Sequence, residues 1–159
     1  MNQQLGAAHW LETRIPPLLL TALFGLLFWL VACYSWRLSP PLWLTVCALA
    51  LWCVGLAIML NAFLTFRLRH TTVDPRTPTA TASLVTNGIF AYSRNPMYLG
   101  MALILLGLFL ILAAPLNLLL WASFIAYLQR FQIAPEERAM VALFGSEYLH
   151  YCQQVRRWI

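Results

Sequence analysis

Four short groups of polar and aromatic residues in the C-terminal half of the chain could carry chemistry. They are residues 84–90 (LVTNGIF), 92–100 (YSRNPMYLG), 135–137 (PEE) and 144–148 (FGSEY). A carboxylate can pair with an ammonium group, and an aromatic face attracts a cation. The backbone around Gly88 and Pro96 can approach a ligand closely. These residue types would therefore suit a small ligand that carries a positive charge.

Several of these residues also have a purely structural explanation. Glu136 and Glu137 would lie in the first turn of a helix, where carboxylates complement the helix dipole by about 0.3 to 1 kcal/mol. Tyr92 is of a type that is common where a helix leaves a membrane. Arg94 and Arg130 flank long apolar runs and could extend toward lipid headgroups. Residue types alone leave both explanations open.

Taken together, the four groups resemble the C-terminal signature of the isoprenylcysteine carboxyl methyltransferase family. That signature reads LVTxG, R-H-P-x-Y-x-G, E-E and F-G-x-E-Y, in the same order and with compatible spacing. The resemblance covers residues 71–158, whereas the N-terminal part matches only in being apolar. It implies a helical, membrane-embedded enzyme that transfers a methyl group from S-adenosylmethionine, bound on the cytosolic side, to a lipophilic acceptor. An isoprenylcysteine-like carboxylate is the favoured acceptor.

The resemblance also implies roles for individual residues. The expected cofactor-binding residues are Leu84, Val85, Gly88, Phe90, Asn95, Pro96, Tyr98, Glu136 and Glu137. We expect Glu136 to pair with the cofactor's ammonium group, and the rings of Phe90 and Tyr98 to face its adenine or its cationic sulfur. Arg130, which would orient an acceptor carboxylate, and Arg94 are the candidate catalytic residues.

One position departs from the signature, because Asn95 stands where many members have histidine. Asparagine cannot titrate, so an acid or base role would be lost while a hydrogen bond to the cofactor would be kept. No G-x-G-x-x-G motif is present, so a Rossmann-type loop does not hold the cofactor. The four cysteines form no CxxC pair and the three histidines are scattered, so the sequence predicts no metal site.

The elements that must position these residues are membrane helices. Of the 159 residues, 62% are hydrophobic and 9% are charged, against about 25% charged in an ordinary soluble domain. The apolar runs predict four spans, at residues 15–36, 42–66, 96–114 and 116–129, although the last is short. We therefore expect an all-α integral membrane protein with about four transmembrane helices in two hairpins. Residues 1–66 would form an N-terminal hairpin, and residues 67–159 the cofactor-binding half.

All ten basic residues are arginines, and their distribution predicts the orientation. Arg37 alone falls on one side of the proposed membrane. The other nine fall on the opposite side: Arg14, Arg67, Arg69, Arg76, Arg94, Arg130, Arg138, Arg156 and Arg157. By the positive-inside rule, both termini are cytoplasmic, and we expect a bacterial inner membrane. The net charge of +5 then favours anionic membrane lipids as partners rather than nucleic acid.

Two cytosolic or interfacial helices should follow the last span. Pro135 predicts the start of a new helix and Gly145 its end. In the final helix, Tyr148, Tyr151, Cys152 and Val155 recur at helical spacing, which indicates an amphipathic helix at the membrane interface. Glycines 100 and 107, seven residues apart in the third span, are expected to be helix-packing positions.

Two other functions remain open on the sequence. An NADPH-dependent membrane reductase of steroid-like lipids would share Asn-Pro-x-Tyr and the glutamate pair, but four spans and few arginines near the loop argue against so large a cofactor. A non-catalytic membrane scaffold or lipid-binding subunit would have no need of Asn95, Tyr98 and Glu136. The sequence does not distinguish a prenylated substrate from a phospholipid amine or a small thiol, and it does not indicate the oligomeric state.

Overall fold

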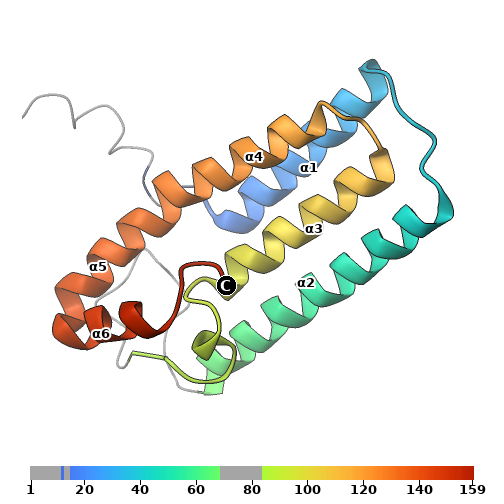
Figure 1. The fold of residues 1–159 in the computed structure, drawn as a ribbon. Coiled ribbons are helices and arrows are strands. Elements are labelled where there is room, and N and C mark those ends of the chain that lie inside the picture. Colours follow the sequence, from blue (N-terminus) through green and yellow to red (C-terminus); the bar gives the residue numbers. More distant parts are fainter. Residues whose placement is uncertain (1–11, 13–14, 69–83) are drawn as a thin grey trace, which may run out of the picture.

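A computed structural model of the chain describes Glu12 and residues 15–68 and 84–159, and these residues form helices with no strand (Figure 1). Part of the predicted polar loop lies outside the described residues. The elements are α1 (Pro17–Tyr34), α2 (Leu42–Leu68), a 3₁₀ turn (Gly88–Ala91), α3 (Pro96–Leu112), α4 (Asn117–Tyr127), a π-helical segment (Leu128–Ile133), α5 (Ala134–Phe144) and α6 (Ser146–Gln154). The all-helical expectation is confirmed for this part of the chain.

Prolines set the starts of two of the apolar helices. Pro17 and Pro96 are the first residues of α1 and α3, where a missing backbone N–H removes no helical hydrogen bond. Ala113 ends α3 in the left-handed region with φ 48°, and its N–H donates to the carbonyl of Phe109. The third predicted span therefore agrees with α3 to within two residues at its C-terminal end.

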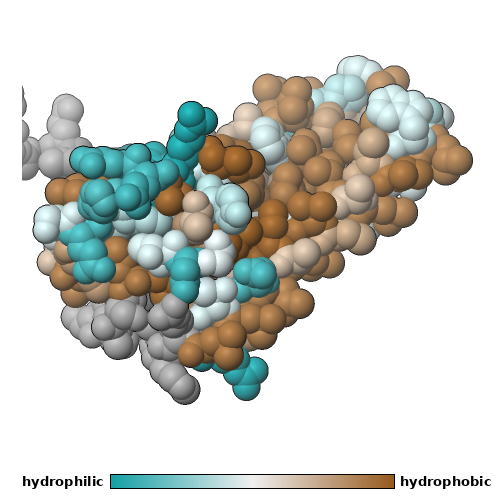
Figure 2. All heavy atoms as spheres, turned by 60° about the horizontal axis from the view of Figure 1, so that its bottom comes forward, coloured by the Kyte–Doolittle hydropathy of each residue, from teal (hydrophilic) through white to brown (hydrophobic). Residues whose placement is uncertain are grey.

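The surfaces of α1 and α2 are suited to lipid. These helices have 18 and 27 residues, and only 17% and 11% of their most apolar 18-residue windows are buried. An apolar core helix of a soluble protein would be mostly buried. Large apolar side chains instead cover the outside, including Leu18, Leu23, Leu26 and Trp29 of α1 and Val46, Leu49, Val54, Leu56 and Leu60 of α2. Figure 2 shows this hydrophobic surface along the helices and a hydrophilic surface at one end. The chain is a membrane protein, with two helices long and apolar enough to span and a shorter third, α3.

The helices that follow each other in sequence are not all neighbours in space. The main partner of α2 is α3, whereas α1 packs on α3 and α4 (Figure 1). The first two helices are thus connected by the short segment at residues 35–41 but lie on different sides of α3. The predicted N-terminal hairpin therefore describes how α1 and α2 are connected, but each of the two helices packs mainly on α3.

Small residues allow α2 and α3 to approach closely. A Cβ atom built on Gly100 would lie 2.6 Å from the carbonyl oxygen of Gly55 and 2.5 Å from Cγ of Met59. One built on Gly107 would lie 2.6 Å from the ring of Trp52, whose Nε1 donates to the carbonyl of Ile104 at 2.9 Å. The expected packing role of both glycines is confirmed.

Pro135 lies in the first turn of α5, as predicted, but α5 is not a separate new helix. Pro135 is the second residue of α5, which continues without a break from α4 through the π-helical segment (Figure 1). Proline has no N–H and its ring clashes with the carbonyl four residues earlier in a regular α-helix. The wider turn of the π-helical segment directly before Pro135 accommodates that ring and the missing hydrogen bond. The predicted end of α5 at Gly145 is confirmed, with φ 52° at this glycine.

The final helix is amphipathic, and its apolar face packs on the protein itself. Tyr148, Tyr151 and Val155 form a buried cluster. Around it lie Leu84, Met140, Phe144 and Cys152. The spacing predicted the face correctly, but the face covers other residues of this chain rather than requiring a lipid interface.

Candidate functional site

The four sequence groups meet at one end of the helices. There the loop before α3, the start of α5 and the C-terminus of the chain come together (Figure 1). This is also the hydrophilic end in Figure 2. The site therefore lies where the apolar bundle ends.

The loop is anchored to the end of α2 by apolar contacts. Val85 and Phe90 are buried with Ala62, and the ring of Phe90 meets that of Phe66 edge-on, with 5.0 Å between centroids. The carbonyl of Phe90 accepts a hydrogen bond of 2.6 Å from the hydroxyl of Tyr151. The ring of Phe90 is thus engaged in packing contacts inside the protein.

Gly88 opens the 3₁₀ turn of this loop. Its φ of +63° lies in the left-handed region, which glycine adopts without strain. Tyr92, just after the turn, is 75% exposed. The loop then reaches Ser93 and Arg94 at the centre of the site.

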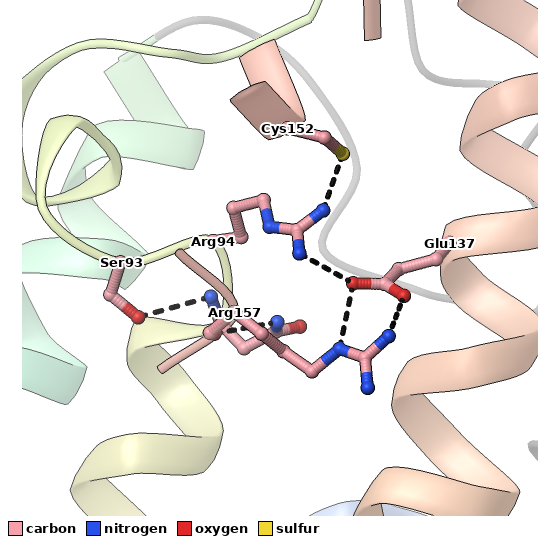
Figure 3. Close-up of polar contacts among 6 residues, drawn as sticks. Ser93, Arg94, Glu137, Cys152 and Arg157 are labelled. Carbon is pink, nitrogen blue, oxygen red and sulfur yellow. Dashed lines mark hydrogen bonds and ion pairs between the residues drawn. The ribbon is translucent and has the colours of Figure 1, made fainter. Parts of the chain in front are cut away.

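Two arginines converge on one carboxylate (Figure 3). Arg157 donates from Nε to Oε1 of Glu137 at 3.1 Å and from Nη2 to Oε2 at 2.5 Å. Arg94 approaches the same carboxylate with Nη2 3.4 Å from Oε1, and its Nη1 donates to the thiol sulfur of Cys152. Hydrogen bonding to Glu137 raises the pKa of Arg157 further above its usual value. The charge of Glu137 is therefore balanced within the protein.

Asn95 joins the loop to the C-terminus. Its backbone N–H donates to Oγ of Ser93 at 3.2 Å, and its side-chain Nδ2 donates to the backbone carbonyl of Arg157 at 3.0 Å. Pro96, the next residue, is buried at the start of α3. The structure thus gives the amide of Asn95 a hydrogen-bonding role that needs no titratable group.

The neighbouring carboxylate, Glu136, has a different environment. The hydroxyl of Tyr98, a buried residue of α3, donates to Oε1 of Glu136. Burial raises the pKa of Glu136 to about 7; the hydrogen bond from Tyr98 acts in the opposite direction, and the charge of Glu137 adds to the rise. Among the described residues, no ion pair involves Glu136. Of the two adjacent glutamates, Glu137 therefore has two arginine partners, and Glu136 has no counter-charge in the described part of the chain.

Arg130 lies apart from the contacts around Glu136 and Glu137. It lies on the π-helical segment, is exposed, and its guanidinium lies over the ring of Phe131 at 5.9 Å from the centroid. Of the two candidate catalytic arginines, the structure brings only Arg94 into contact with Glu137. The sequence prediction missed Arg157 as a site residue, because it had been assigned to headgroups with the other arginines.

Comparison with known proteins gives one family and several relatives. The model of the phospholipid methyltransferase family matches residues 43–147, which is more than half of the chain. An uncharacterized protein of Haemophilus influenzae is 46% identical over 63 residues, covering 40% of this chain and all of that protein. No solved structure matches.

Two relatives are described as protein-S-isoprenylcysteine O-methyltransferases. The one from Saccharomyces cerevisiae is 36% identical over 75 residues, covering 45% of this chain and 30% of the yeast protein. The one from Homo sapiens is 28% identical over 119 residues, covering 75% of this chain and 42% of the human protein. The chain thus spans less than half the length of either protein. The matched region holds Arg94, Tyr98, Glu136 and Glu137, and the resemblance seen in the four motifs is confirmed. The chain belongs to the phospholipid methyltransferase family, a family of methyltransferase enzymes.

Proposed function

We propose that this protein transfers a methyl group from S-adenosylmethionine to a lipophilic acceptor that reaches the site from the bilayer. The favoured acceptor is an isoprenylcysteine-like carboxylate. The observation that carries the proposal is the environment of Glu136, a carboxylate held by Tyr98 at the end of an apolar bundle and without a cation among the described residues. Family membership supports the methyl transfer.

The residues present fit the amino acid part of this cofactor. A desolvated carboxylate without a counter-charge is unfavourable, so an ammonium group would be stabilised beside Glu136. Glu137, which the sequence motifs also assigned to the cofactor, is already balanced by two arginines, so we propose that Glu136 alone pairs with the ammonium. The buried Nε of Arg94 has no hydrogen-bond partner in the described part of the chain and suits the cofactor's carboxylate.

The rest of the proposed cofactor site comes from the loop and the start of α3. We retain Leu84, Gly88 and Pro96 as backbone contacts, and Asn95 for its amide. Val85 and Phe90 pack against the end of α2, so we propose that they support the loop rather than touch the cofactor. Tyr98, in the first turn of α3, is buried as well, but its hydroxyl contacts Glu136, so it stays the proposed aromatic contact.

When bound, S-adenosylmethionine supplies a methyl carbon attached to a cationic sulfur. An acceptor oxygen would take this methyl carbon, and the sulfur would leave with the electron pair of the carbon–sulfur bond. A carboxylate acceptor, with a pKa of about 3.5, is already ionised near neutrality and needs no base. The protein then contributes alignment and exclusion of water. Arg130 remains the proposed residue for orienting the acceptor carboxylate.

We propose four spans, α1, α2, α3 and α4 with part of the π-helical segment, in a bacterial inner membrane. Both termini and the polar site would face the cytoplasm, because nine of ten arginines fall on that side. Arg37 would be the single basic residue on the other side. A cysteine placed at Ser39 should then react with a membrane-impermeant thiol reagent only from outside the cell; labelling from the cytoplasmic side alone would reverse this orientation.

The function is tested by ligand choice. We would measure the melting temperature of the purified full chain in detergent with S-adenosylmethionine, S-adenosylhomocysteine and NADPH. Transfer of a labelled methyl group to a farnesylcysteine analogue would be measured in parallel. Stabilisation by the two adenosyl compounds together with methyl transfer is expected. Stabilisation by NADPH alone would identify a reductase, and no stabilisation would identify a non-catalytic protein.

A further inference from the structure

The last five residues of the chain, residues 155–159, form a non-helical C-terminal segment with bends at Val155 and Arg157. Val155 ends α6 with φ −122° and ψ 132°, and its side chain is buried beside Tyr148 and Tyr151. Trp158 packs against the core cluster that contains Tyr98. Figure 1 shows that the segment runs from α6 to the start of α3. The chain end is thus fixed by buried side chains at two points.

The backbone of the C-terminal segment holds the loop before α3. The N–H of Arg94 donates to the carbonyl of Arg156 at 3.1 Å. The side-chain amide of Asn95 donates to the carbonyl of Arg157 at 3.0 Å. Both donors belong to the signature motif that opens α3, so the position of that motif depends on the chain end.

The side chain of Arg157 extends from the same segment to α5. Its two hydrogen bonds to Glu137 form a bidentate contact, which holds both partners in a specific geometry. The side chains of Glu137 and Arg157 are 17% and 40% exposed. One residue thus connects the loop, through its carbonyl, with α5, through its guanidinium.

This connection determines which of the two glutamates can pair with a bound ammonium group. Arg157 and Arg94 occupy the carboxylate of Glu137, and Glu136 is left with the hydroxyl of Tyr98. Without Arg157, Glu137 would keep only the longer contact to Arg94 and would compete for a bound ammonium. A lysine at 157 would supply the charge but not two parallel N–H donors.

We infer that the C-terminal segment completes the cofactor site, with Arg157 as a positioning residue that acts through Glu137. It holds α5 and the loop in the arrangement in which Glu136 receives the cofactor's ammonium group. This inference rests on the proposed function. It adds a residue beyond the four signature motifs and gives the end of the chain a part in cofactor binding.

The first test compares two arginines in the full chain. We would titrate S-adenosylmethionine calorimetrically into purified Arg157→Gln, with Arg138→Gln as the matched control, because Arg138 is a neighbouring exposed arginine that pairs with Glu12 instead. Loss of a charge-assisted bidentate contact should weaken binding by about tenfold or more. In methyl transfer, the KM for the cofactor should rise more than kcat falls. Arg138→Gln should bind like the unmodified chain.

Two further variants separate positioning from general stability. In a double-mutant cycle with Glu137→Gln, replacing Arg157 as well should weaken binding by less than about threefold more, because its partner is already neutral. Arg157→Lys, which keeps the charge, should not restore full affinity. It also serves as the decisive variant should Arg157→Gln fail to fold.

The outcomes are distinct. An unmodified chain that does not bind S-adenosylmethionine would contradict the proposed function itself. An unmodified chain that binds it, together with equal affinity in Arg157→Gln or in Arg157→Lys, would overturn the role of Arg157 alone. If the Arg157 and Glu137 substitutions each weakened binding by a factor and the two factors multiplied in the double variant, a role of Arg157 exerted through Glu137 would likewise be overturned.

Discussion

At the scale of single residues, Glu136 and Glu137 show how much the surroundings of a carboxylate determine its use. Glu137 meets two guanidinium groups and Glu136 meets a tyrosine hydroxyl. In the sequence they are equivalent neighbours after an apolar run. Only the contacts of α5 with Tyr98 of α3 and with the chain end distinguish them, and their contrast leads to two predictions.

Replacing Glu136 with glutamine should weaken S-adenosylmethionine binding. Glutamine keeps the size and one acceptor oxygen but leaves the cofactor's ammonium without its counter-charge. The loss of such an ionic hydrogen bond is about 1.5 to 3 kcal/mol, or roughly ten- to a hundred-and-fifty-fold in affinity. Calorimetric titration measures this directly.

The matched control for this substitution is Glu147→Gln, which removes an exposed carboxylate from the first turn of α6. A helix-dipole role is worth less than about 1 kcal/mol of stability and does not affect binding. If Glu136→Gln behaved like this control, with unchanged affinity and a small drop in melting temperature, Glu136 would be a structural residue only.

The raised pKa of Glu136 predicts opposite pH trends for stability and for binding. Its pKa is about 7 in the folded protein against an ordinary value of 4.5, so folding favours the neutral acid. This contribution to the free energy of unfolding is fully present below pH 4.5 and is lost as the pH rises to about 7. Pairing with an ammonium group requires the ionised form, so cofactor affinity should increase over the same pH range.

Thermal unfolding and calorimetry at several pH values, with the unmodified chain and Glu136→Gln, would follow both trends. The glutamine variant has no proton to lose at this position, so it should show neither contribution. A cofactor affinity that did not change between pH 5 and about pH 7 in the unmodified chain would contradict an ionised Glu136 as the partner of the ammonium.

The sequence motifs indicated most of the residues that the structure brings together, and they missed the links between them. Arg94, Asn95, Tyr98 and the glutamate pair were all identified from the motifs, since their types and spacing are local. Arg157 was missed because its contact with Glu137 joins two elements 20 residues apart. A motif records which residues recur along the chain and does not record which carboxylate a distant arginine meets.

At the scale of elements, the α2–α3 contact is the most extensive helix packing in the described part of the chain. Gly100→Ala would place a Cβ atom 2.6 Å from a backbone oxygen of Gly55. The backbone of α2 cannot move aside as a side chain can, so we expect a loss of about 1 to 3 kcal/mol in the free energy of unfolding. Unfolding in detergent, followed by circular dichroism, would measure it.

Gly25→Ala is the matched control in α1. A Cβ atom there would lie 3.8 Å or more from the nearest side-chain atoms, which is ordinary contact, and alanine is the better helix former. This variant should be neutral or slightly more stable. Equal stability of Gly100→Ala and Gly25→Ala would show that the α2–α3 interface is looser than the structure has it.

The sequence indicated the starts of these helices to within two residues, but it did not indicate that one helix continues from another. Pro96 begins α3 as predicted, and α1 begins at Pro17, two residues after the predicted start at residue 15. Pro135 lies in the first turn of α5 as predicted, yet the π-helical segment before it lets α4 continue into α5 without a break. The sequence rule assumes regular α-helical hydrogen bonding, and an irregular turn removes that assumption.

At the scale of the whole molecule, the neighbours of each helix were the least predictable feature. Apolar runs indicate which segments can span a bilayer, but side chains that face lipid and those that face another helix are equally apolar. The pairing of α2 with α3, and of α1 with α3 and α4, depends on small residues and on a few polar contacts. One such contact is the buried amide of Asn117, which donates to the carbonyl of Phe28 at 3.2 Å.

The position of the site at the end of an apolar bundle predicts how the acceptor is selected. A lipophilic chain gains about 0.8 kcal/mol for each CH₂ group that it buries in the membrane. Extending a cysteine acceptor from geranyl to farnesyl should therefore lower its apparent KM by at least about tenfold in liposomes, with a much smaller change in kcat.

Entry from the bilayer can be separated from entry through water by comparing acceptors of different solubility. If the acceptor reaches the site within the membrane, the farnesyl compound is concentrated where the site opens, whereas a compound that stays in water is not. A short, fully water-soluble analogue that was methylated as fast as the farnesyl compound at the same bulk concentration would contradict entry from the membrane. In that case, the function of the apolar surfaces of α1 and α2 would be to anchor the protein in the membrane.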